Sequence, residues 1–181
     1  ERPARWLYDE QNAMLPMDLP APEASAGPVP MPAIVLDNGF GGFTPDGREY
    51  VVVLEGERET PLPWSNVLAN AGFGTMVSSA GSAFTWAGNS RENRLTPFAN
   101  DPLTDPTGEA FFLRDEETGA VWGGTPAPLP RRPGDGRWVI RHAAGVTRYQ
   151  HAVSGVMQEL AVFVATEDPV KLAVLTVANT S

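Results

Sequence analysis

Glycine and proline interrupt this chain so often that few long helices can form. The sequence has 18 glycines and 18 prolines among its 181 residues. Both residues disfavour helix interiors, glycine through its backbone entropy and proline through its missing amide hydrogen. From Ile34 onward, short apolar runs alternate with turn-forming residues. This spacing predicts an all-β fold, an antiparallel β-sandwich with very little helix.

The apolar runs predict ten strands. Each run is rich in β-branched, aromatic or aliphatic residues and is bounded by residues that favour turns. The predicted strands are Ile34–Leu36, Glu49–Leu54, Thr75–Ser79, Ala83–Trp86, Ala110–Arg114, Ala120–Trp122, Trp138–His142, Val146–Val153, Val156–Ala165 and Val170–Ala178.

Turn residues predict two hairpins among these strands. In Phe111–Trp122 an acidic turn closes on Gly119, a residue that can adopt a positive φ. In Tyr149–Phe163 the pair Ser154-Gly155 separates two apolar runs. The second of these runs and the run Val170–Val177 carry apolar residues on both faces, which predicts that both strands are buried.

Residues 1–32 are interpreted as an N-terminal arm and a proline-rich linker, and residues 33–181 as one sandwich domain. Six prolines between Pro16 and Pro32 favour extended backbone over packing. A domain rarely ends directly after a central strand, so we expect the chain to be the N-terminal part of a longer domain, with sandwich strands beyond Ser181. Exposed sheet edges are then expected to pair with another copy, giving a homodimer.

Charge and composition argue against several function classes. The 22 acidic and 13 basic residues give a net charge of -9, which repels nucleic acid and anionic lipid. Without cysteine, neither disulfides nor thiolate chemistry are available. No apolar run approaches the roughly 20 residues that span a bilayer. We expect a cytoplasmic protein that needs no cofactor and inserts no segment of this sequence into a membrane, although segments outside it could attach a longer parent.

Three motifs that could carry chemistry have simpler structural interpretations. The glycine-rich stretch Asn38–Phe43 resembles a phosphate loop, but a turn and a strand follow it where a nucleotide site needs a helix. It is read instead as a tight strand connection whose aromatic residues pack on a sheet. His142 and His151 lack a third ligand for zinc.

The third motif comprises the carboxylates Asp101, Asp105 and Glu109, which could supply the two acids of a glycosidase. The Asp-Pro pairs at Asp101 and Asp105 look more like turn formers whose carboxylates cap nearby amides. We therefore do not expect these groups to be catalytic.

The densest polar segment, Trp86–Pro106, is the main candidate for ligand contact. Few of its residues could fill a core, and a long structured loop of this kind is often functional or packs on itself. Planar amides, carboxylates and aromatic faces are also the groups that bind sugars. The candidate sugar-contacting or interface residues are Trp86, Asn89, Arg91, Glu92, Asn93, Arg94, Asn100 and Asp101. We further expect at least one of the two arginines to bond inward to Asp101, Asp105 or Glu109.

Several long motifs resemble a known enzyme family. They are Asn38–Tyr50, Thr60–Val67, Asn89–Pro102, Gly108-Glu109 with Leu113–Asp115, and Asp168–Lys171. Over about residues 34 to 181 the chain is similar to glycosyltransferase family 36, now grouped with glycoside hydrolase family 94. Within that family it is most similar to the C-terminal part of cyclic β-1,2-glucan synthetases. Phe98 departs from the family pattern, which has tryptophan at that position.

The resemblance implies the N-terminal supersandwich of these enzymes, a two-sheet domain like that of galactose mutarotase. In the family a helical catalytic barrel follows it, supplies the general acid, and uses inorganic phosphate as co-substrate in inverting phosphorolysis. None of that barrel lies in this sequence, so no catalytic residue is carried over.

The favoured function is a non-catalytic module of a glucan-active glycosyltransferase or glycoside phosphorylase, supporting domain packing and dimerisation. Its expected partners are the helical barrel and, through the parent enzyme, a β-glucan or oligosaccharide. A stand-alone carbohydrate-binding domain and a mutarotase-like epimerase are the alternatives, and the second would need a histidine acid.

Overall fold

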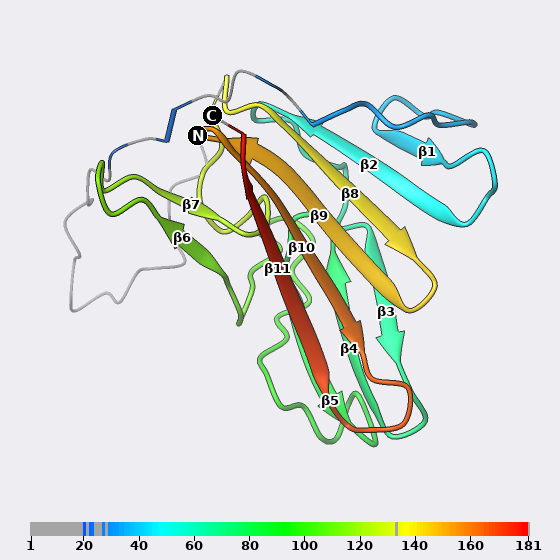
Figure 1. The fold of residues 1–181 in the computed structure, drawn as a ribbon. Coiled ribbons are helices and arrows are strands. Elements are labelled where there is room, and N and C mark those ends of the chain that lie inside the picture. Colours follow the sequence, from blue (N-terminus) through cyan, green and yellow to red (C-terminus); the bar gives the residue numbers. More distant parts are fainter. Residues whose placement is uncertain (1–19, 21, 24–26, 28, 133, 181) are drawn as a thin grey trace.

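The computed structural model describes residues 20, 22–23, 27, 29–132 and 134–180 and contains only strands, turns and loops over these residues. Figure 1 shows the strands arranged as one large twisted sheet with smaller sheets beside it. The strands are β1 (Gly41–Phe43), β2 (Glu49–Glu55), β3 (Ser65–Ala69), β4 (Phe73–Ser78), β5 (Ala83–Ala87), β6 (Phe112–Arg114), β7 (Val121–Gly123), β8 (Arg137–Ala143), β9 (Val146–Val153), β10 (Val156–Val164) and β11 (Lys171–Asn179). The all-β, antiparallel prediction is confirmed.

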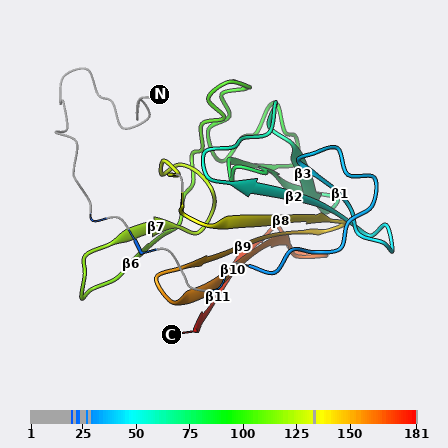
Figure 2. The same ribbon diagram turned by 90° about the horizontal axis from the view of Figure 1, so that it is seen from above.

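The large sheet has six strands in the order β1-β2-β8-β9-β10-β11, and every neighbouring pair is antiparallel. A three-stranded sheet, β3-β4-β5, packs against one of its faces, and the hairpin β6-β7 forms a separate two-stranded sheet. In the view from above the β6-β7 hairpin projects to one side of the larger sheets (Figure 2).

The main core lies between the two larger sheets. It contains ten buried residues, which come from β2, β3, β4, β5, β8, β9 and β10. Alternation explains this arrangement, because side chains two residues apart along a strand share a face of the sheet. The core residues are Val52, Leu54, Leu68, Val77, Ala83, Trp138, Ile140, Tyr149, Leu160 and Val162.

Both predicted hairpins are confirmed. Val153 pairs with Val156 across Ser154 and Gly155, whose φ angles of 50° and 69° fit a two-residue turn of the type that matches strand twist. In the hairpin β6-β7, Arg114 pairs with Val121, and Gly119 adopts a φ of 73° where the acidic turn closes.

Eight of the ten predicted strands coincide with β2 and β4 to β10, with bounds that shift by a few residues. The predicted strand Ile34–Leu36 is wrong, because only Val35 forms an isolated bridge there, to Phe43. The short strand β1 was missed because two of its three residues are glycines. A side chain at Gly41 would overlap the carbonyl oxygen of Val51, so the close approach of β1 to β2 requires glycine.

The strand β3 was also missed, because it begins with the polar pair Ser65-Asn66. The Asn66 amide donates to the carbonyl oxygen of Ala143 at 2.9 Å and to the Thr147 hydroxyl at 3.1 Å. A polar side chain therefore fixes β3 against the turn between β8 and β9, and the hydrophobic pattern gave no indication of it.

The last strand, β11, is present, but the prediction that it is buried is wrong. It forms one edge of the large sheet, and eight of its nine residues are exposed. The exposed residues alternate without a buried face, so the apolar side chains on both faces of this strand meet solvent. Leu172, Val174, Leu175 and Val177 are 38% to 50% exposed.

This apolar edge predicts self-association of the chain. An exposed edge strand presents unpaired backbone groups, and its apolar side chains add a hydrophobic term when a second copy pairs with it. We expect Val174→Lys to shift the chain toward monomer in light scattering coupled to size exclusion over a dilution series. Leu62→Lys is the control, because Leu62 is 58% exposed in a loop. A wild-type chain that stays monomeric throughout would contradict this prediction.

Candidate functional site

The candidate site is the long loop between β5 and β6, and its first half is a compact turn. The Asn89 side chain accepts hydrogen bonds from the backbone amides of Arg91 at 2.8 Å and Glu92 at 3.0 Å. The backbone amide of Asn93 donates to the Asn89 carbonyl oxygen at 3.0 Å, and its own carbonyl accepts from Ala87. Asn89 therefore shapes the turn through its side-chain oxygen.

The charged side chains of this turn point to solvent. Arg91 and Glu92 pair with each other at 3.4 Å, and their side chains are 85% and 74% exposed. The Arg94 guanidinium donates to the Ser90 carbonyl oxygen at 3.2 Å and lies 5.6 Å from the centre of the Phe98 ring. The prediction that an arginine bonds inward to Asp101, Asp105 or Glu109 is wrong, because both arginines are exposed and held by local partners.

Aromatic residues form the layer beneath the loop. Phe84 stacks on Phe98 with ring centres 4.5 Å apart and contacts Trp86 at 5.0 Å. Trp86 also lies across Gly74, where any side chain would overlap the indole ring. The candidate residue Trp86 is therefore half-buried and packs the loop onto the three-stranded sheet.

The second half of the loop is a second capped turn. The Asp101 carboxylate accepts hydrogen bonds from the amides of Leu103 at 2.9 Å and Thr104 at 3.3 Å and from the Thr104 hydroxyl at 2.7 Å. This confirms that Asp101 is a turn former. Asn100, exposed, and Asp105, half-buried, adopt positive φ angles of 44° and 41° at the two ends of this turn.

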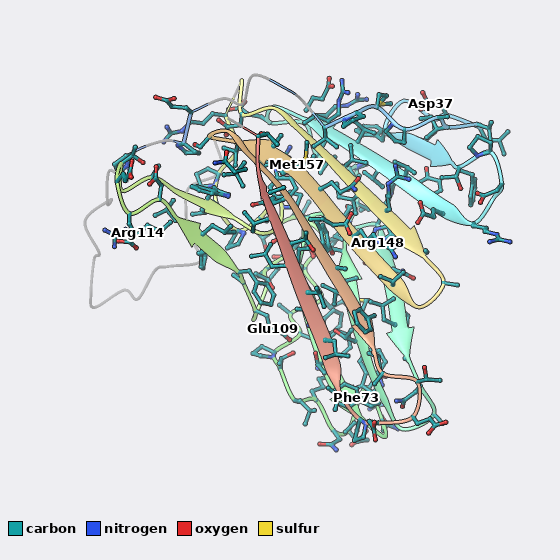
Figure 3. All side chains as sticks on the ribbon, in the orientation of Figure 1. Asp37, Phe73, Glu109, Arg114, Arg148 and Met157 are labelled. Atoms are coloured by element: carbon teal, nitrogen blue, oxygen red, sulfur yellow. The ribbon has the colours of Figure 1, made fainter. Side chains whose placement is uncertain are left out.

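Two carboxylates anchor the loop to the sandwich. Asp105 accepts a 2.6 Å hydrogen bond from the Ser78 hydroxyl at the end of β4. Glu109 pairs with Lys171 of β11 at 2.7 Å and accepts from the Thr85 hydroxyl at 3.2 Å. Figure 3 shows Glu109 beside β11. The cation that holds the loop inward is thus Lys171, which sequence reasoning missed.

Both histidines form hydrogen bonds within the large sheet. His142 bonds the Thr147 hydroxyl through Nδ1 at 3.0 Å, its Nε2 is buried without a partner, and burial lowers its pKa to about 4. His151 is 3% exposed, stacks on Trp138 at 4.2 Å, and donates from Nδ1 to the Arg137 carbonyl oxygen. Burial lowers the pKa of His151 as well. The His151 ring is thus buried in the sheet, and the half-buried His142 ring is bonded to Thr147 of the neighbouring strand.

Two of the motifs meet at the other end of the molecule. Phe40 and Tyr50 come from the motif Asn38–Tyr50, and both contact Trp64 edge-on with ring centres 5.9 Å and 5.8 Å apart. Phe43 packs on Tyr50 at 5.0 Å. The interpretation of Asn38–Phe43 as a connection that lets its aromatic residues pack is confirmed.

Two features are absent from the described residues. No group of three or more His, Asp or Glu side chains there is arranged to bind a metal ion. The same part of the chain contains no helix that could cross a membrane.

The described residues thus form a two-layer antiparallel β-sandwich with a structured polar loop after the last strand of its smaller sheet. Residues 48–181 match the family described as glycosyl hydrolase 94, supersandwich domain. The chain belongs to this family.

Similar proteins include a glucan synthase and two phosphorylases. The chain is 43% identical over 80% of its length to the cyclic beta-(1,2)-glucan synthase NdvB of Rhizobium meliloti (strain 1021), of which it covers 5%. It is 30% identical over 79% of its length to solabiose phosphorylase of Paenibacillus borealis and 27% identical over 78% to N,N'-diacetylchitobiose phosphorylase of Vibrio furnissii. It covers 18% and 17% of these two relatives, so the chain spans a small part of each.

The anchoring carboxylate gives a stability prediction. We expect Glu109→Gln to lower the free energy of unfolding by about 1–3 kcal/mol, because Lys171 would lose its charged partner in a half-buried setting. Glu92→Gln is the matched control and should stay within about 0.5 kcal/mol, since exposed ion pairs contribute little. Urea denaturation of both variants checks this, and equal midpoints would contradict the proposed anchor.

The buried histidine gives a pH prediction. Because the folded-state pKa of His142 lies near 4 and the unfolded value near 6.5, the unfolded state binds more protons between these values. Stability is therefore full above the unfolded pKa and falls as the pH drops through this window. We expect His142 to account for a loss of about 2 kcal/mol between about pH 7.5 and pH 5.

Urea denaturation at both pH values measures this loss, and His142→Gln should reduce it by that amount. His151 remains in both proteins and serves as a common background. The same pH dependence in wild type and variant would show that His142 is not the group responsible.

Proposed function

We propose that this chain supplies a non-catalytic sandwich module of a glucan-active glycosyltransferase or inverting glycoside phosphorylase. The observation that carries the proposal is that the loop between β5 and β6 has two parts, one that holds its shape and one that is exposed. Its caps and anchors use Asn89, Asp101, Asp105 and Glu109, whereas the charged groups of its tip face solvent. Such a loop is a rigid surface for contact with another domain, a partner protomer or a sugar.

Family membership supports the choice of enzyme class. Two of the similar proteins are named for phosphorolysis and one for glucan synthesis, and each is far longer than this chain. In a longer parent the catalytic acid would come from the helical domain, with inorganic phosphate as co-substrate. Phosphate would be the nucleophile, so one protein acid would suffice.

A stand-alone carbohydrate-binding domain is the second candidate. The exposed guanidinium groups of Arg91 and Arg94 and the exposed amides of Asn93 and Asn100 favour it, because they could bond sugar hydroxyls. The epimerase alternative has less support. A mutarotase-like reaction needs an accessible histidine acid, and His142 and His151 are both engaged within the sheet.

An activity assay of the purified 181-residue chain tests the module proposal. We expect no release of glucose 1-phosphate from β-1,2-glucooligosaccharides with inorganic phosphate, and no acceleration of glucose mutarotation. Calorimetric titration with the same oligosaccharides separates a module from a stand-alone binder, since only the binder should show saturable heat. Turnover that copurifies with the chain through successive columns would overturn the module proposal.

The loop surface is tested in the full-length parent. We expect Arg91→Ala to leave the melting temperature of the isolated chain unchanged, because the side chain is 85% exposed. In the parent the same change should weaken dimerisation or activity. A parent that keeps both would show that this tip of the loop is not a contact surface.

A further inference from the structure

The face of the large sheet that points away from the main core carries a second apolar cluster. Val51 of β2, Val139 of β8 and Ala152 of β9 are 0%, 0% and 4% exposed, although no second sheet among the described residues covers them. The cluster also includes Val29, which is 3% exposed and lies in the proline-rich segment. Ile34, Val53 and Met157 pack around these buried residues. Figure 3 shows Met157 near one end of the molecule and Phe73, in the three-stranded sheet, near the other end.

Polar contacts hold the same segment at two further points. An Arg137 guanidinium nitrogen lies 3.4 Å from the Val29 carbonyl oxygen and donates to it. At Glu23 the backbone amide donates to the Ser154 hydroxyl at 3.0 Å, and the backbone carbonyl accepts from the Ser154 amide at 2.8 Å. The second contact is a reciprocal pair at the turn between β9 and β10, so it fixes the direction of the segment as well as its position.

Thr180, which follows β11, binds the same turn. The backbone amide and the hydroxyl of Thr180 both donate to the Gly155 carbonyl oxygen, at 2.7 Å and 2.9 Å. Ser154 and Gly155 therefore hold Glu23 and Thr180 next to each other. Both turn residues have positive φ angles, a conformation that aims their backbone groups outward at the end of the hairpin.

We propose that the proline-rich segment is a strap of the sandwich. The apolar outer face formed by Val51, Val139 and Ala152 is an interaction surface whose partners are this chain's own Val29 and Ile34, and the Ser154-Gly155 turn holds Glu23 of the same segment. This revises the interpretation of the segment as a linker, at least for its described residues. The strap precedes the family match, which begins at residue 48, and it does not depend on the proposed function.

The composition of the segment suits this role. Prolines pre-set an extended backbone, so the strap loses less conformational entropy when it docks than a flexible chain would. They also lack amide donors, so the segment lies on a sheet face without adding a ladder strand. The side chains of Val29 and Ile34 and three backbone groups supply the attachment.

Cleavage by a glutamate-specific protease tests the strap in the full chain, because the carbonyl of the bond after Glu23 is engaged by Ser154. Cleavage after Glu117, which is exposed in the turn of the β6-β7 hairpin, serves as the internal reference. We expect Val29→Ser to raise the rate of cleavage after Glu23 by about tenfold, because the variant loses most of the buried apolar area of Val29. Met31→Ser is the matched control, since Met31 is 51% exposed in the same segment.

A second variant keeps the core intact. Ser154→Gly suits the φ of 50° and removes only the hydroxyl that accepts from Glu23, so cleavage after Glu23 should rise severalfold while the melting temperature holds. Faster cleavage in Val29→Ser than in Met31→Ser supports the strap. Equal rates in wild type, Val29→Ser and Ser154→Gly would overturn it.

Discussion

The position of Ser78, at the end of β4, links the core to the candidate site. Its carbonyl oxygen accepts a 2.7 Å hydrogen bond from the hydroxyl of Tyr149, a fully buried residue of the opposite sheet. Its own hydroxyl donates to Asp105 in the loop. Burial, with a further contribution from the negative charge of Asp105, raises the pKa of Tyr149, so this tyrosine stays a neutral donor. One serine thus joins the packing of the two sheets to the path of the loop.

The path of the loop between β5 and β6 depends on the hydrogen bond between Ser78 and Asp105. Asp105 and Glu109 fix its second half to the ends of β4 and β11, and Phe98 fixes the middle by stacking on Phe84. Between these attachments the chain satisfies its own backbone groups through aspartate and asparagine caps, so the loop holds one shape without a strand ladder. Arg91 and Glu92 at the tip of the loop take part in none of these attachments and stay exposed. Their side chains are therefore free to contact another surface.

Local chemistry explains how far the sequence predicted the structure. The hairpin turns at Ser154-Gly155 and Gly119 were predictable because a few adjacent residues decide them. The burial of β11 was not, because it depends on whether another layer covers the strand. The pairing of Glu109 with Lys171 joins residues 62 positions apart, and no local pattern indicates it. The same applies to Val29, whose burial depends on three strands that come later in the chain.

The meeting of Glu23 and Thr180 at the Ser154-Gly155 turn has a consequence for how this chain can be rewired. Because the two residues lie at one turn, a short peptide could join them while new termini open in the exposed turn after Asp115, which is a circular permutation.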